Sequence, residues 1–308
     1  REGNGAITTE SLACGVKMTI KGEGETGTPA KLTVNGGTIQ GCYYGISGNG
    51  TRHNTEITIN DGVIQDGGDG GTAIYQPQNG TLTIHGGTIQ SSNTAIEIRS
   101  GSLTVTGGTI TGGTEEPVVS ENGSGTTTSN TGIAVAQHAT KEPITVNITG
   151  GTITGGAAVY ESNPQNNDET NAVTVSITDA DLKGDLRSTG FGNVSVNNAT
   201  IDGNVSKGTS GNMGIVDSTI TGNVPTGTNV TLVNCVDEND NPISGTVPEG
   251  AVAMVNGQSF NDLQDALNAA TSGDTVYLVN DIDDLCLNAG NNQSQINIGM
   301  ANITLDGR

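Results

Sequence analysis

The hydrophobic positions of this chain form a repeat. An apolar-polar-apolar triplet, a four-residue polar or small stretch and one more apolar residue recur, as in Leu32-Thr-Val-Asn-Gly-Gly-Thr-Ile39. The first and last apolar residues are seven positions apart in eight copies, which begin at Leu32, Ile57, Leu82, Leu103, Val146, Val175, Val194 and Met213. Alternation with a period of two is typical of a strand, and Gly-Gly or Asn-Ala inside the copies favours a tight bend. Each copy therefore predicts short strands joined by bends.

A third apolar site follows each copy, at Ile46, Ile74, Ile96, Ile133, Val159, Leu186, Val205 and Val224. One copy cannot bury its apolar side alone, whereas parallel stacking of the copies buries a continuous aliphatic column. Degenerate copies near Val16 and Val230 extend the series. The pattern predicts an all-β chain, a parallel β-helix of roughly nine coils spaced about 4.8 Å apart, within residues 1–236.

This pattern resembles the right-handed parallel β-helix of the pectin-lyase-like superfamily over roughly residues 12–236. The resemblance, together with the usual chirality of parallel crossovers, implies a right-handed coil. The repeat motif Leu-Thr-Val-x-Gly-Gly-Thr-Ile-x-Gly also resembles the repeats of adhesin-like surface proteins of Gram-positive gut bacteria. That resemblance implies an extracellular or cell-surface location.

The pattern changes after Cys235. Residues 237–250 are acidic, contain Pro242 and Pro248, and read as a linker. Residues 259–270 predict one amphipathic helix with Ser259 as its N-cap and Gly273 beyond its end. A strand is expected at 275–279, with shorter ones near 296–298 and 303–305. We interpret residues 251–308 as the start of a second β-helix; the alternative is a cap over the open end of the first column.

Composition narrows the class of protein. Gly supplies 48 of 308 residues and aromatics only 2%, which is too little side-chain volume for an ordinary α/β enzyme core. No run of 18 apolar residues occurs, so we expect no membrane insertion. The net charge of −21 argues against a nucleic-acid partner and favours solubility outside the cell. We expect a monomer.

The sequence offers little that suggests catalysis. The resemblance implies polysaccharide lyases or hydrolases with clustered charges, but their Asn-Thr-Asp, Gly-His-Gly and Trp-Ile-Asp-His motifs are absent. The best carboxylate cluster is Asp179, Asp181 and Asp185, for which a solvated turn is the default interpretation. His85 occupies a slot that other copies fill with Asn or Thr, which indicates a polar outward position. We therefore predict no catalytic residue, no metal and no cofactor.

Four cysteines, at 14, 42, 235 and 286, lack the C-x-x-C spacing of a zinc site. Buried free thiols and one disulfide both remain open.

A binding surface is the more promising prediction. Tyr75, Glu97 and Tyr160 each follow the third apolar site by one residue and should point outward on one sheet. Tyr44 and Arg99 lie close to that row in sequence. Exposed aromatic rings beside polar groups are typical of sugar sites. We predict glycan or cell-surface protein binding at Tyr44, Tyr75, Glu97, Arg99 and Tyr160; the alternative is that these tyrosines only cover aliphatic edges.

The sequence therefore predicts a non-catalytic surface module, an adhesin or a stalk. The alternative function is a polysaccharide-active β-helix whose site lies in a missing part or in the insertion loop at 115–131.

Overall fold

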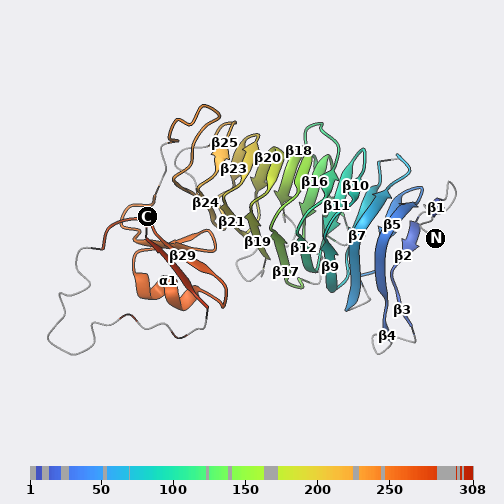
Figure 1. Ribbon diagram of the computed structural model, residues 1–308, viewed down its shortest axis with the longest axis horizontal. Helices are drawn as coiled ribbons and strands as arrows, with labels where there is room; N and C mark the ends of the chain where they lie inside the picture. The colour runs from blue at the N-terminus through green and yellow to red at the C-terminus, as the bar shows by residue number, and fades with distance from the viewer. Residues whose placement is uncertain are drawn as a thin grey trace.

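The chain forms a long stack of parallel strands followed by a smaller unit, as the computed structural model shows (Figure 1). The structure describes residues 5–8, 14–21, 28–50, 54–68, 70–122, 125–137, 141–162, 173–224, 229–243, 247–282, 296, 299 and 302–307. The strands of the stack pair in parallel with those of the neighbouring coils, which confirms the predicted parallel β-helix.

The β-helix has three faces. The first face contains the starts of β5 (Lys31–Gln40) and β7 (Thr55–Gln65), then β9 (Gly80–Ile84), β12 (Gly101–Val105), β17 (Ile144–Ile148), β19 (Val173–Thr178), β21 (Asn193–Asn197), β24 (Met213–Val216) and β26 (Val230–Val233). The second contains β1 (Ala6–Thr8), the ends of β5 and β7, β10 (Thr88–Gln90), β13 (Thr109–Thr111), the starts of β18 (Thr152–Glu161) and β20 (Asp181–Ser188), β22 (Thr200–Asp202) and β25 (Thr219–Ile220). The third contains β2 (Cys14–Lys17), β6 (Tyr44–Ser47), β8 (Thr72–Gln76), β11 (Thr94–Ile98), β16 (Thr131–Val135), the ends of β18 and β20, and β23 (Val205–Lys207).

The predicted aliphatic column is the core. Fifteen of the sixteen seven-spaced anchors are buried, and Leu32, in the first copy, packs partly buried against them. The third apolar site is buried at Ile46, Ile74, Ile96, Ile133, Val159, Leu186 and Val205. Since each anchor lies beside its counterpart in the next coil, every coil covers its neighbour's apolar side.

The bends between the first two faces use two chemistries. Earlier coils place glycine in a left-handed conformation, for example Gly87 with φ 82° and Gly108 with φ 91°. Later coils use Asp179 (φ 53°) and Asn198 (φ 49°), which tolerate that conformation better than other side chains. Asn198 Nδ2 also donates to Asp179 Oδ1 at 2.5 Å. Asp179 therefore has a structural role in its bend.

The insertion at 115–131 carries a short antiparallel hairpin, β14 (Val119–Asn122) with β15 (Gly125–Thr128). Arg187 holds its base, because the guanidinium donates to both carboxylate oxygens of Glu116, at 2.5 and 3.1 Å. A second hairpin pairs β3 (Ile20–Lys21) with β4 (Thr28–Pro29). The sequence also predicts a second excursion at 161–171, which lies mostly outside the described residues.

The C-terminal unit combines β27 (Ala253–Val255), β28 (Gln258–Phe260), α1 (Leu263–Ala269), β29 (Thr275–Leu278) and β30 (Thr304–Gly307). The predicted helix exists, but its expected N-cap was wrong. Ser259 lies in β28, and Asp262 caps α1 by accepting from Gln264 N and Asp265 N at 2.7 and 3.2 Å. The β27–β28 hairpin occupies the residues that sequence periodicity assigned to the first helical turn.

The C-terminal unit packs on the first face. Met254 is buried with Val216 and Tyr277, and a Cβ at Gly214 would overlap the Met254 side chain. The outward positions Gly214 and Val216 are thus small or apolar where the two preceding coils carry Ser, Thr or Asn. Within the linker, Ile243 packs against the end of the aliphatic column. Among the described residues, no helix combines the length and the hydrophobicity that a membrane span requires.

Candidate ligand-binding surfaces

The predicted site residues form part of an outward row on the third face. Tyr75 of β8 pairs in register with Glu97 of β11, Glu97 with Ala134, and Ala134 with Tyr160. Tyr75 and Tyr160 are thus three coils apart, as their spacing in the repeat indicates. Tyr160 is buried, and Ala134 separates it from Glu97 in the row. Tyr160 therefore does not form one cluster with the other tyrosines.

Three tyrosines do gather at one corner of the β-helix. The Tyr44 and Tyr75 rings stack with centroids 5.3 Å apart, and Tyr43 meets Tyr44 edge to face at 4.8 Å. Arg99 lies over the Tyr75 ring, 5.7 Å from its centroid. The ring faces of Tyr44 and Tyr75 thus contact each other, and the Tyr75 ring also contacts Arg99. Tyr43, by contrast, is 44% exposed.

A hollow of about 360 Å³ borders this stack, which we call the tyrosine hollow. It is lined by Cys14, Lys17, Tyr44, Ser47, Gly48, Asn49, Gly50, Tyr75 and Pro77. Burial raises the pKa of the Tyr44 and Tyr75 hydroxyls, so both stay protonated at neutral pH and can donate or accept hydrogen bonds. The hollow can therefore offer hydroxyl groups to a ligand more readily than flat ring faces.

Glu97 and Arg99 point outward from the coil but are buried, with 5% and 1% of their surface exposed. Arg99 Nε donates to Glu97 Oε1 at 2.7 Å, and Arg99 Nη1 lies 3.4 Å from the Tyr75 hydroxyl. Burial raises the pKa of Glu97, and the Arg99 charge opposes that rise. These two residues form an internal ion pair that supports Tyr75, which differs from the exposed contact surface expected for them.

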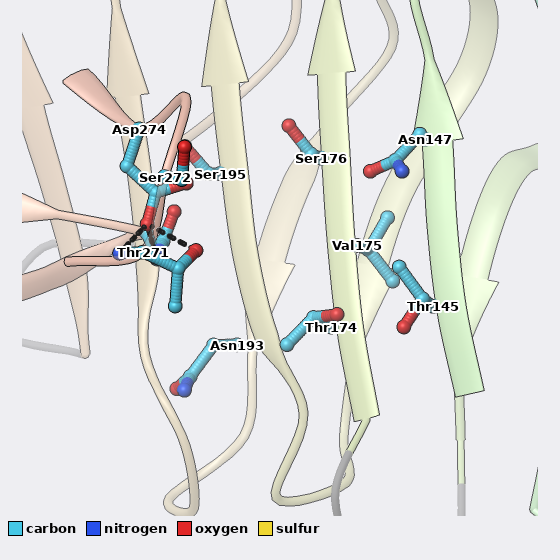
Figure 2. A pocket seen from close by; sticks show the side chains of 11 residues that line it. Thr145, Asn147, Thr174, Val175, Ser176, Asn193, Ser195, Thr271, Ser272 and Asp274 are labelled. Carbon is cyan, nitrogen blue, oxygen red and sulfur yellow. Dashed lines mark hydrogen bonds between the residues drawn. The ribbon is translucent and has the colours of Figure 1, made fainter. Parts of the chain in front are cut away.

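A second concave surface lies between the first face and the C-terminal unit, and we call it the strand-face groove. Figure 2 shows side chains from β17, β19 and β21 on one side and the segment 271–274 on the other. The groove has a volume of about 470 Å³ and is lined by Thr145, Asn147, Thr174, Val175, Ser176, Asn193, Ser195, Asn256, Thr271, Ser272 and Asp274. Its lining is dominated by hydroxyl and amide groups.

The repeat explains how these groups come to share one surface. Asn147, Ser176 and Ser195 occupy the same outward position in three successive coils. Thr145, Thr174 and Asn193 occupy the outward position two residues earlier. Neighbouring strands lie about 4.8 Å apart, so each row presents a polar group at nearly the repeat of the stack.

Among the described residues that line the strand-face groove, Asp274 is the one carboxylate. Its Oδ2 accepts from Thr271 N at 2.6 Å, Thr271 Oγ1 at 2.9 Å and Asn256 Nδ2 at 2.8 Å. These bonds hold the segment 271–274 in place. They leave Asp274 suited to shaping the groove rather than to moving a proton.

The strand-face groove was not predicted from the sequence. Its outward Thr, Ser and Asn positions are visible in the repeat, but the wall formed by Asn256 and 271–274 depends on how the C-terminal unit docks. The signal available in the sequence was the change from polar to small or apolar at Gly214 and Val216, which marks the docking surface.

The other residues considered for chemistry do not converge on one site. His85 is exposed, with Nδ1 2.9 Å from Thr106 Oγ1, and Asp181 lies outward on β20. Asp185 accepts from Arg187 and from Asn204 N. No three His, Cys, Asp or Glu side chains within the described ranges lie close enough to hold a metal ion together. Asp283, Asp284 and Cys286 lie outside those ranges.

A buried polar network near the C-terminal coils was also missed. Glu161 accepts from Ser188 Oγ at 2.6 Å and Gly190 N at 3.1 Å, and Lys207 Nζ donates to Gly190 O at 2.8 Å. Glu161, Ser188 and Lys207 share one register position, which Ile98 and Val135 occupy in earlier coils. Burial raises the pKa of Glu161 and lowers that of Lys207. The network satisfies the backbone of the 189–192 turn.

Cys235 is buried, and its thiol donates to Ile215 O at 3.4 Å. Burial raises the pKa of this thiol, which keeps it protonated and inert at neutral pH. Cys14 is half-buried in the tyrosine hollow.

Comparison of the chain with protein-family models, with curated proteins and with solved structures finds no match.

Proposed function

We propose that this chain is a non-catalytic module of an extracellular or cell-surface protein, an adhesin or stalk, that binds a neutral glycan chain in the strand-face groove. The single observation that carries the proposal is the groove lining, in which successive coils present hydroxyl and amide groups opposite a polar wall. A ligand rich in hydroxyl groups can exchange its water contacts for hydrogen bonds along such rows.

Charge favours a neutral over an acidic glycan. The chain carries a net charge of −21, and the described groove lining contains no Lys or Arg. A polyuronate would therefore meet repulsion without a compensating cation. The rows of Thr, Ser and Asn provide uncharged partners.

Binding is favoured over cleavage by the carboxylates present. Glycosidic hydrolysis commonly uses two carboxylates flanking the bond. The described lining of the strand-face groove supplies only Asp274, which already accepts three hydrogen bonds. Cleavage of a polysaccharide by the insertion at 115–131, or by a part beyond this chain, is the alternative that the experiment below addresses.

A glycan array of neutral and acidic saccharides, read with the whole chain and with Ser176→Tyr, tests the proposal. Ser176 is exposed at the centre of the groove, so the added ring fills the groove without entering the core. We expect wild type to bind neutral glycans and Ser176→Tyr to lose at least tenfold in affinity, about 1.4 kcal/mol. Thr83→Tyr is the matched control, because Thr83 holds the same outward row three coils away.

Equal glycan affinity of wild type and Ser176→Tyr would show that the strand-face groove is not the binding site. If Tyr43→Ala loses glycan affinity instead, the site lies where Tyr43, Tyr44 and Tyr75 gather. A glycan would there contact the exposed Tyr43 ring and the neighbouring hydroxyls. Release of shortened saccharides above the buffer level would support the enzymatic alternative.

We also propose that the C-terminal unit begins a second β-helix. β29 and β30 pair in parallel, with Thr275 opposite Thr304. That offset of 29 residues equals the offset between Val146 and Val175 in the first β-helix. A parallel pair at one-coil spacing is what the opening coil of a solenoid requires.

A further inference from the structure

Asp66 stands out among the buried polar residues away from the strand-face groove. The residue is 7% exposed, and its Oδ2 is sealed from solvent without a hydrogen-bond partner. Asp66 also makes no ion pair with the described residues. Burying an unpaired carboxylate is costly, so a charge partner from outside the chain would relieve the cost.

The position is unusual for this repeat. Asp66 follows Gln65 at the end of the second face, where other coils place a residue with little or no side chain: Gly41, Ser91, Gly112, Gly155, Gly184, Gly203 and Gly222. A Cβ at Gly112 would overlap the Thr131 carbonyl, so the slot is normally too tight for a side chain. Six residues, 66–71, separate β7 from β8, whereas three residues separate the corresponding strands in the neighbouring coils, at 41–43 and 91–93. The longer connection makes room for a carboxylate that the fold does not need.

Asp66 lines a polar hollow of about 440 Å³ together with Gln40, Gln65, Gly67, Gly68, Gln90, Ser91, Ser92 and Thr111. The three glutamines form a ladder, with Gln90 Nε2 donating to Gln65 Oε1 at 2.6 Å and Gln65 Nε2 to Gln40 Oε1 at 2.5 Å. Because the amide nitrogens of Gln65 and Gln90 point along the ladder, the Gln90 carbonyl oxygen at its end is available as a neutral ligand. Ser92 and the backbone carbonyls of Gly67 and Gly68 add further oxygens.

We propose that this hollow binds a calcium ion through Asp66. Because Oδ2 is sealed from solvent, the cation would bind Oδ1, and it would neutralise the charge of the whole carboxylate, whereas a hydroxyl donor would leave that charge in place. Calcium takes six to eight oxygen ligands, including side-chain and backbone carbonyls and water, and accepts irregular geometry. Magnesium requires a stricter octahedral arrangement. With one carboxylate among the described lining residues, we expect a dissociation constant in the range of extracellular calcium modules, about 0.1–1 mM.

The test is isothermal titration with calcium chloride and thermal unfolding with and without calcium, using the whole chain at constant ionic strength. We expect wild type to bind saturably and its Tm to rise with calcium. Asp66→Asn should weaken binding at least tenfold and abolish the Tm increase. In the absence of calcium, Asp66→Asn should unfold at the same or a higher temperature than wild type, because it removes an unpaired buried charge.

Two further variants keep the proposal falsifiable. Asp66→Ser installs the residue that the next coil uses at Ser91, so it should fold and should also lose the calcium response. Asp61→Asn changes an exposed aspartate on the same strand, β7, and should respond to calcium as wild type does. The proposal is overturned if wild type shows no saturable binding, if Asp66→Asn keeps it, or if Asp61→Asn loses it too. An equal response to magnesium would indicate charge screening and would also overturn it.

Discussion

The Glu97–Arg99 ion pair places two charges on the third face where water scarcely reaches. Arg99 is one of the largest fully buried side chains, and its Nε is 2.7 Å from Glu97 Oε1. A buried ion pair adds little stability compared with apolar residues of similar volume. Removing one partner, however, leaves the other charge buried and unpaired. The stability of the region around Tyr75 is therefore sensitive to a single substitution in this pair.

Arg99→Met should destabilise the chain by about 3–5 kcal/mol at neutral pH, because it leaves the Glu97 carboxylate buried without its cation. Burial already raises the pKa of Glu97, and loss of Arg99 should raise it further. A carboxyl group with a raised folded-state pKa binds its proton more tightly when folded. Stability should therefore fall as pH rises from the unfolded value, about 4.3, through the raised folded value. Urea unfolding at acidic and neutral pH measures this dependence.

The double variant Glu97→Gln with Arg99→Met is the control for that prediction. It removes both charges, so we expect it to recover much of the lost stability and to lose the added pH dependence. If Arg99→Met is equally destabilised at every pH, the loss comes from packing of the arginine side chain and not from the stranded carboxylate.

At the scale of the element, the bends between the first two faces place a left-handed residue at one of two positions, directly before the second-face strand, as at Gly87, or one residue earlier, as at Asp179. Gly87 and Gly108 provide a left-handed residue in early coils, and Asp179, Asn198 and Asp217 provide one in later coils. Asn and Asp enter this conformation at small cost, whereas β-branched residues do not. A bend therefore constrains the residue type without requiring one residue.

Asn198→Val should cost about 1–2 kcal/mol of unfolding free energy, since valine would have to adopt a φ of 49°. Asn198→Gly keeps the backbone conformation and loses only the bond to Asp179, so its cost should be clearly smaller. Urea unfolding of both variants makes the comparison. Equal losses would show that the side-chain hydrogen bond, and not the backbone, limits this bend.

The elements also show what could be predicted from the sequence. The seven-residue spacing predicts the aliphatic column, because a strand-bend-strand unit has only one way to turn both anchors inward. The expected start of α1 was wrong because Ser259 pairs with Met254 in the β27–β28 hairpin, whose turn, Asn256-Gly257, lies directly before the helix pattern. Burial of Glu97 and Arg99 could not be predicted, since the repeat indicates the direction of a side chain and not what covers it. The strand-face groove required docking of segments about a hundred residues apart.

At the scale of the whole molecule, the groove exists only while the C-terminal unit is docked. Met254, which is 1% exposed, anchors that unit between Val216 and Tyr277. Thr231 and Ser259 add a hydroxyl contact at 3.1 Å. The β-helix itself is stabilised by contacts between adjacent coils, so the two units should respond differently to a change at this contact.

Met254→Asp should release the C-terminal unit from the first face, because docking would then bury an unpaired carboxylate. We expect the radius of gyration from small-angle X-ray scattering to increase and glycan affinity to fall with the loss of the groove wall. The thermal transition of the β-helix should change little, since its coils keep their neighbours. Gln258→Asp, an exposed change on the same hairpin, should leave all three quantities near their wild-type values. A compact Met254→Asp variant that still binds glycan would show that the wall formed by 271–274 does not depend on this anchor.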